Sequence, residues 1–128
     1  MAGEPILVVD DNATNVKLLT FLLQGRGYEV RAAADAERAL ATLSEFRPRL
    51  ILMDIQLPGI DGLTLTRQLR ADPAMRDVLI VAVTAYAMTG DAERALEAGC
   101  DGFISKPIDT RAFPAEVASY LARGREAG

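Results

Sequence analysis

Short apolar runs alternate along this chain with longer stretches in which apolar residues recur at helical spacing. Four runs are continuous rather than alternating and are rich in β-branched residues: 6–9, 50–53, 78–83 and the weaker 102–105. This pattern is typical of strands that are covered on both faces, as in a parallel sheet. A fifth segment, residues 28–33, alternates apolar and polar positions, which predicts a strand at the edge of the sheet.

Between these runs the spacing predicts five amphipathic helices. The first helix carries Val16, Leu19, Leu22 and Leu23, and the second should have Ala36, Ala39, Leu40, Leu43 and Phe46 on its inner face. The third should point Leu65 and Leu69 inward. The fourth carries Ala92, Ala95 and Leu96, and the fifth carries Phe113, Val117, Tyr120 and Leu121. Gly25 and Gly27 should end the first helix, Asp35 should cap the second, and Asp61 should cap the third, which should stop near Asp72-Pro73. The fourth should begin at Thr89 or Asp91 and end at Gly99. Asp109 or Thr110 should open the last helix, and Pro114 places its start near Ala112 or Phe113.

Strands that alternate with helices form repeated βαβ units. Right-handed crossovers place helices on both faces of one doubly wound parallel sheet, so the expected class is α/β. The chain has 128 residues and contains no internal repeat and no linker rich in Pro, Gly or Ser. We therefore expect a single domain over residues 1–128, with a folded core at about 5–122.

Composition removes several classes of function. The chain has no histidine, which excludes His-based triads and His-ligated metals, and Cys100 is its only cysteine. The net charge is −4 and arginines are scattered among acids, which argues against direct nucleic-acid binding. The sequence has no signal peptide and no apolar run near the roughly 18 residues of a membrane span, so we expect a cytoplasmic protein with no membrane contact.

Candidate chemistry lies where the predicted strands end. In open α/β sheets, ligands bind outside the carboxyl ends of the strands. The strands deliver four short segments there: Asp10-Asp11, Asp54, Thr84-Ala85 and Lys106-Pro107. Three carboxylates, a hydroxyl and an ammonium should therefore meet at one edge, although they lie far apart in the sequence.

Each of these residues alone also has a structural interpretation. Asp10-Asp11 could cap a helix, Asp54 could be a turn aspartate, and Thr84 and Lys106 could be an ordinary strand residue and a solvated lysine. Together they indicate more, because unit charges ~4 Å apart repel by about 4 kcal/mol at an effective dielectric constant of 20. Gathered carboxylates need a cation, and hard oxygen ligands suit Mg²⁺. A carboxylate nucleophile with Mg²⁺, a hydroxyl and a lysine makes a phosphoryl-transfer site.

The same residues carry a family resemblance. The segments 8–12 (VVDDN), 52–59 (LMDIQLPG), 83–86 (VTAY) and 106–107 (KP), in this order and at strand ends, resemble the receiver domain of two-component response regulators over about residues 5–122. The chain is most similar to stand-alone receivers of the cell-cycle type, and residues 98–108 also recur in receivers of hybrid kinases. The resemblance implies a flavodoxin-like (βα)₅ fold with strand order 2-1-3-4-5.

The resemblance also assigns roles. It implies that Asp54 accepts a phosphoryl group from a phosphohistidine of a partner kinase or phosphotransfer protein, with Mg²⁺ as cofactor. It implies that Asp11, Asp54 and the backbone carbonyl of Gln56 ligate the ion directly, and that Asp10 acts mostly through a metal-bound water. The phosphate-binding positions are Thr84, Ala85 and Lys106, and the Lys106-Pro107 bond is expected to be cis. Such a domain is not an enzyme for an external substrate, although it catalyses its own phosphorylation and slow autodephosphorylation.

Signal output follows by the same analogy. Thr84 and Tyr86 match the switch positions, where Tyr86 could otherwise be an ordinary surface tyrosine. The readout face would be the fourth helix, fifth strand and fifth helix, which would contact a downstream protein. Asn12 and Gln56 occupy positions that tune dephosphorylation, and the Gln56 amide is expected to orient the attacking water.

Rival functions share part of this pattern. A flavin or nucleotide binder would need a phosphate loop after the first strand, where this chain has Asp10, Asp11 and Asn12. A Mg²⁺-dependent aspartyl phosphatase resembling haloacid dehalogenases would need Asp-x-Asp there and room for a cap domain. A degenerate receiver would lack part of the residue set. A receiver fragment of a larger hybrid kinase or regulator is also compatible with the sequence.

Overall fold

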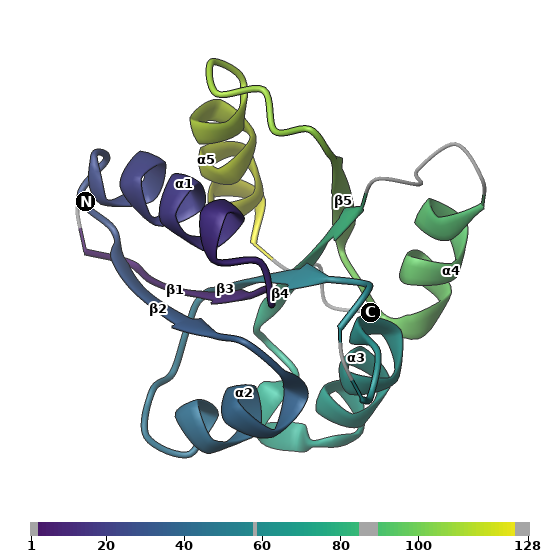
Figure 1. Cartoon of the computed structure of the whole chain (residues 1–128). Helices are drawn as coiled ribbons and strands as arrows, with labels where there is room; N and C mark the ends of the chain where they lie inside the picture. Colours follow the sequence, from purple (N-terminus) through teal and green to yellow (C-terminus); the bar gives the residue numbers. More distant parts are fainter. Residues whose placement is uncertain (1–2, 58, 85–89, 125–128) are drawn as a thin grey trace.

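The structure is a computed structural model that describes residues 3–57, 59–84 and 90–124, with only the backbone for residues 91 and 92. Strands and helices alternate along the chain (Figure 1). The elements are β1 (Pro5–Val9), α1 (Ala13–Gln24), β2 (Glu29–Ala33), α2 (Ala36–Leu43), β3 (Leu50–Asp54), α3 (Gly62–Ala71), the 3₁₀ turn η1 (Pro73–Met75), β4 (Leu79–Thr84), α4 (Asp91–Ala98), β5 (Gly102–Ser105) and α5 (Phe113–Arg123).

All pairings within the sheet are parallel, and the strand order is β2-β1-β3-β4-β5. The expected α/β class and strand order are therefore confirmed. Strand β2, the one with the alternating sequence, lies at an edge, whereas every residue of the central strands β3 and β4 is buried. The stronger continuous runs thus mark the strands that helices cover on both sides. The weaker run 102–105 forms β5 at the other edge of the sheet, where Phe103 and Ser105 are exposed, so the expected cover on both of its faces was wrong.

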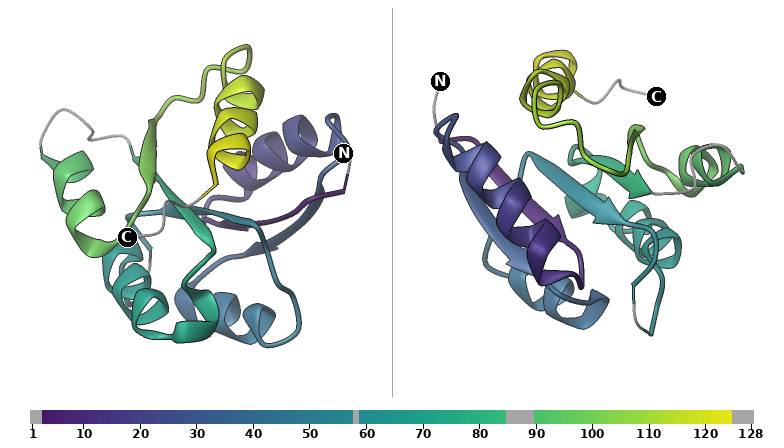
Figure 2. Two further views of the ribbon diagram at one scale, coloured as in Figure 1. Left: turned by 180° about the vertical axis from the view of Figure 1, so that it is seen from behind. Right: turned by 45° about the horizontal axis from the view of Figure 1, so that its top comes forward.

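Two apolar layers lie on opposite faces of the sheet, since alternate side chains of each strand point to opposite sides. On one face α1 and α5 pack over Ile6, Val8 and Leu52. On the other face α2, α3 and α4 pack over the intervening residues, among them Leu7 and Ile51. Figure 2 shows the helices on the two faces of the sheet from behind and with the top tilted forward. Helices thus cover the central strands from both sides.

The helix caps follow the sequence in most places. Asp35 accepts a hydrogen bond from the backbone N–H of Arg38 at 2.8 Å, and Asp61 accepts one from Thr64 at 2.8 Å. Helix α3 ends at Ala71, directly before Asp72-Pro73. The side chains of Asp35 and Asp61 thus satisfy N–H groups that the first turn of a helix leaves unpaired.

Two expectations about the helices were wrong. Leu40 is 42% exposed, because it lies at the flank of the stripe that Ala36, Ala39 and Leu43 bury. Helix α5 begins at Phe113, which confirms the start that Pro114 indicated. The expected opening at Asp109 or Thr110 was wrong, because Asp109 caps a separate turn by accepting from the N–H groups of residues 111 and 112. Helix α4 begins at Asp91 after Gly90, and Thr89 lies outside the described residues.

Among the described helices, none combines the length and the apolar character that crossing a membrane would require.

Candidate functional site

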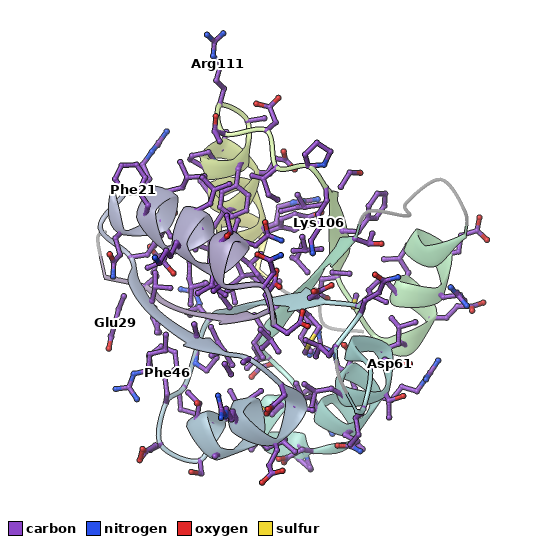
Figure 3. All side chains as sticks on the ribbon, viewed as in Figure 1. Phe21, Glu29, Phe46, Asp61, Lys106 and Arg111 are labelled. Carbon is purple, nitrogen blue, oxygen red and sulfur yellow. The ribbon has the colours of Figure 1, made fainter. Side chains whose placement is uncertain are left out.

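Four charged side chains from three strand ends meet at the carboxyl edge of the sheet. Carboxylate oxygens of Asp10, Asp11 and Asp54 all lie within 4.8 Å of one another. The Nζ atom of Lys106 lies 3.4 Å from Oδ2 of Asp54 and 3.7 Å from Oδ2 of Asp10. The structure thus brings together the acids and the lysine that the sequence placed at one edge. Lys106 is labelled in Figure 3, beyond the end of β5.

Strand register explains this meeting. Val9 of β1 pairs with Met53 of β3, so Asp10 and Asp54 follow at the same level of neighbouring strands. Thr84 of β4 pairs with Ser105 of β5, and the N–H of Lys106 donates to the carbonyl oxygen of Thr84 at 2.8 Å. The Lys106-Pro107 peptide bond is cis, as expected.

Asp10 holds one satisfied and one unsatisfied oxygen. Its side chain is almost fully buried, and Oδ1 accepts the backbone N–H of Asn12 at 2.8 Å. Oδ2 is buried and accepts no hydrogen bond from the described residues. A buried carboxylate oxygen without a hydrogen bond is costly, and a bound cation would satisfy it. The donor set therefore fits a hard divalent ion such as Mg²⁺.

Asp54 is buried at the end of the central strand β3. The pKa of its carboxyl group is raised from 3.8 to about 6, chiefly by burial and also by the nearby Asp10 charge, although the N–H of Gln56 and the ammonium of Lys106 act to lower it. The Gln56 N–H donates to Oδ1 at 3.0 Å. The negative charge of Asp54 is thus only partly stabilised by the protein itself, which leaves it responsive to an added cation.

The remaining predicted site residues have different surroundings. Asp11 and Gln56 are exposed, and Thr84 is buried at the end of β4. The side chain of Asn12 is the N-cap of α1 and accepts from the N–H of Asn15 at 3.0 Å. Ala85 and Tyr86, predicted to bind phosphate and to act as a switch, lie outside the described residues.

The structural interpretations of these residues are resolved differently. Asn12, not Asp10 or Asp11, caps α1, so the capping interpretation of that pair was wrong. Asp54 does accept a turn N–H with one oxygen, while its other oxygen faces Lys106. Lys106 has a side chain that is only 21% exposed, and it forms ion pairs with two buried acids rather than standing free in solvent.

One residue at this site was missed at the level of sequence. Gly62, the first residue of α3, packs directly against the backbone carbonyl of Asp54. The sequence did hold one signal of a special role for Gly62: it directly follows the cap Asp61, at a helix position where glycine lowers helix stability.

The fold and the acidic edge together define a receiver domain of two-component signalling, in which parallel strands carry clustered aspartates and a lysine on one edge. The chain belongs to the response regulator receiver domain family, whose model matches residues 6–118. The resemblance stated from the motifs is therefore confirmed.

Similar proteins agree with this assignment. The chain is 44% identical over 116 residues to the polar-differentiation response regulator DivK of Brucella anthropi, covering 91% of this chain and 94% of that protein. A response regulator structure from Chloroflexus aurantiacus superposes with a TM-score of 0.89 at 35% identity, covering 94% of this chain and 99% of that one.

A third relative bears on the metal. The receiver domain of a sensor histidine kinase from Pseudomonas aeruginosa superposes with a TM-score of 0.86 at 36% identity, covering 94% of this chain and 99% of that chain. That crystal structure holds a magnesium ion coordinated in the active site cleft. Family membership favours a receiver over the flavin binder and the aspartyl phosphatase. It also places the protein among domains that interact with histidine kinases and downstream targets.

Proposed function

We propose that this protein is a phosphoacceptor switch in a histidine–aspartate phosphorelay and that Asp54 is the acceptor. The observation that carries the proposal is the buried carboxylate of Asp54, with Lys106 Nζ at 3.4 Å and oxygens of Asp10 and Asp11 within 4.8 Å. The carboxylate of Asp54 is the nucleophile, Lys106 supplies a positive partner for the incoming negative charge, and the acidic cluster can hold a cation beside it.

The residues that would hold Mg²⁺ are Asp10, Asp11, Asp54 and the backbone carbonyl of Gln56. When bound, the ion neutralises charge on the carboxylates and on the phosphoryl oxygens. An oxygen of Asp54 forms a bond to phosphorus as the N–P bond of the partner's phosphohistidine breaks, and the released imidazole nitrogen takes up a proton. The Nζ of Lys106 donates to a phosphoryl oxygen, with the hydroxyl of Thr84 and the N–H of Ala85 as further donors.

Loss of the phosphoryl group completes the cycle. Water attacks phosphorus, the O–P bond to Asp54 breaks, and inorganic phosphate leaves. We propose that the exposed side chain of Gln56 orients this water, and that Asn12 tunes the same step. The chain would thus catalyse its own phosphorylation and slow autodephosphorylation without turning over an external substrate. An unchanged phosphoaspartate lifetime in Gln56→Ala would refute the role of Gln56.

We propose output through the face formed by α4, β5 and α5, with Thr84 and Tyr86 as the switch. Leu96 of α4 and Phe103 of β5 are 50% and 38% exposed on this face, which suits a protein target. Input would come from a histidine kinase or a histidine phosphotransfer protein. We propose a single receiver unit over residues 1–128, core about 5–122, in the cytoplasm, where a free thiol such as Cys100 stays reduced.

The decisive experiment is exposure of the protein to phosphoramidate with Mg²⁺, followed by intact mass measurement. We expect wild type to gain one phosphoryl group and Asp54→Asn to gain none. Asp35→Asn is the matched control, because this aspartate is only a helix cap, and it should be labelled like wild type. Labelling of Asp54→Asn would refute the proposal, and steady turnover of small phosphate esters would favour the aspartyl phosphatase instead.

One alternative keeps the chemistry and changes the context. The 36% identity to the receiver of a sensor histidine kinase also fits a receiver that works as part of a larger hybrid kinase. Asp54 would have the same role there, so the labelling experiment applies to both.

A further inference from the structure

Gly62 is the point where helix α3 touches the strand that carries the proposed phosphoacceptor. A Cβ atom added to Gly62 would overlap the carbonyl oxygen of Asp54. It would also lie 2.9 Å from Cα of Ile55 and 3.0 Å from the carbonyl carbon of Asp54. Real Cβ atoms essentially never come this close to backbone atoms, so this contact admits only a residue without a side chain.

Backbone conformation does not explain this glycine. Gly62 is a helical residue of α3, and it is not among the described glycines with positive φ. In a helix alanine is more favourable than glycine by up to about 1 kcal/mol. The glycine is therefore required by what it touches.

Both sides of the contact are held in place. The N–H of Gly62 donates to the carbonyl oxygen of Ile55 at 2.8 Å, and the hydroxyl of the buried Thr66 donates to the carbonyl oxygen of Gly62 at 2.8 Å. Leu65 and Leu69 anchor α3 in the core. Strand β3 lies between β1 and β4 and cannot withdraw as a whole. An added methyl group would therefore be accommodated by rotation of the Asp54–Ile55 peptide.

That peptide is coupled to the carboxylate of Asp54. Oδ1 of Asp54 accepts the N–H of Gln56, two residues along, in a short turn that begins with the same peptide. Rotation of the peptide moves the Gln56 N–H and releases Oδ1 from its only backbone donor among the described residues. The other oxygen would then no longer be fixed near Lys106 and Asp10.

We propose that Gly62 is a positioning residue for Asp54: the missing side chain seats α3 against the Asp54–Ile55 peptide and so fixes the carboxylate in the acidic cluster. The proposal rests on the function proposed for Asp54. It concerns geometry that exists before any phosphoryl group arrives, so it can be tested without phosphorylation.

The test compares Gly62→Ala with two controls. Gly25→Ala places a methyl group at the C-cap glycine of α1, which has helical dihedral angles, and there the nearest backbone oxygen is 3.3 Å away, tighter than usual but without overlap. Thr66→Val removes the hydroxyl bond to Gly62 and destabilises the same helix without adding an atom near Asp54. All proteins are studied at 10 °C in sucrose, with folding checked by circular dichroism.

The first readout is the backbone amide resonance of Gln56 in metal-free protein. In wild type it should shift as Asp54 titrates, because the two are hydrogen-bonded. We expect Gly62→Ala to lose this dependence, to bind Mg²⁺ more weakly, and to accept phosphoryl from phosphoramidate up to about a hundredfold more slowly, the loss that misplacing a reactive group by about 1 Å can cause. Gly25→Ala and Thr66→Val should keep both properties.

The outcomes separate the two proposals. Equal losses in Gly62→Ala and Thr66→Val would overturn the positioning role, because they would reflect helix stability alone. Retention of the Gln56 titration in Gly62→Ala, or its failure to fold in every condition, would overturn it too. If wild type takes no phosphoryl group while Gly62→Ala still loses the titration, the proposed function fails and the positioning role stands.

Discussion

The two ends of the sheet both hold clustered charged side chains, but they balance the charge differently. At the carboxyl edge, the cluster of Asp10, Asp11 and Asp54 faces Lys106, and an oxygen of Asp10 accepts no hydrogen bond from the described residues. At the opposite edge, Arg70 of α3 pairs with Asp101, which precedes β5, at 2.7 Å between Nη2 and Oδ2.

The Arg70–Asp101 pair is surrounded by backbone partners. Arg70 also donates to the carbonyl oxygens of Gly99 and Val78, each at 2.8 Å. Oδ2 of Asp101 accepts the N–H of Ile80 at 2.9 Å. This network of charged side chains and backbone groups joins α3, the start of β4 and the end of α4.

The difference separates stability from function. A half-buried ion pair that also has backbone hydrogen bonds is satisfied by the protein itself, and removing one partner is costly. A cluster with surplus negative charge is held in place by the rest of the fold and gains when a cation arrives. We therefore expect opposite responses to mutation at the two edges.

The largest effect should come from breaking the balanced edge. Arg70→Met should lower the free energy of unfolding by about 3 kcal/mol, because it removes the ion pair with Asp101 and the charged hydrogen bonds to the carbonyl oxygens of Gly99 and Val78. Urea denaturation would measure this loss. Arg47→Met is the control, since Arg47 is exposed and makes one hydrogen bond to Ala74, and it should change stability by less than about 0.5 kcal/mol. Equal midpoints for the two variants would contradict the comparison.

The next effect should come from supplying the cation at the acidic edge. Mg²⁺ at one hundred times its dissociation constant should raise the free energy of unfolding of wild type by about 2.7 kcal/mol. Asp11→Asn should need more Mg²⁺ for the same gain, because one carboxylate of the cluster becomes a neutral amide. Calorimetric melts at matched ionic strength with NaCl would separate binding from screening. A gain that NaCl reproduces would contradict a specific site.

A smaller effect should come from removing the charge of Asp54 in metal-free protein. Its pKa is raised from 3.8 to about 6, so between these values the folded protein holds a proton that the unfolded chain has released. Stability contributed by the neutral form is therefore complete below about pH 4 and lost as pH rises to about 6.

Asp54→Asn has no such loss. Above pH 6 it should be more stable than wild type by on the order of 2 kcal/mol, and below pH 4 the two should converge. Urea midpoints measured in EDTA across this range would test it. A difference that does not depend on pH would show that something other than the charge is responsible.

The smallest effect should come from the cap beside the site. Asp61, labelled in Figure 3, accepts the backbone N–H of Thr64, and this bond holds the pKa of Asp61 below its usual value. Its contribution is present at neutral pH and is lost as pH falls through the lowered pKa. Asp61→Ala should cost about 1 kcal/mol at pH 7, and Asp61→Asn should cost little because asparagine caps equally well. Thermal melts of both variants would show whether the cap acts as a hydrogen-bond acceptor.

The sequence by itself determined the layout of this protein. Continuous apolar runs such as 50–53 identified the central strands, and Asp35 and Asp61 marked helix starts, because burial on both faces and capping act over a few residues. The residues at the predicted strand ends included the acids and the lysine of the site, because parallel strands bring their carboxyl ends to one edge of the sheet.

Only the tertiary structure decided how these groups are balanced. The approach of Gly62 to Asp54 and the pairing of Arg70 with Asp101 depend on register and helix placement. So does the buried oxygen of Asp10. Such contacts join residues distant in sequence or set by fractions of an ångström, and no local pattern of apolar and polar residues encodes them.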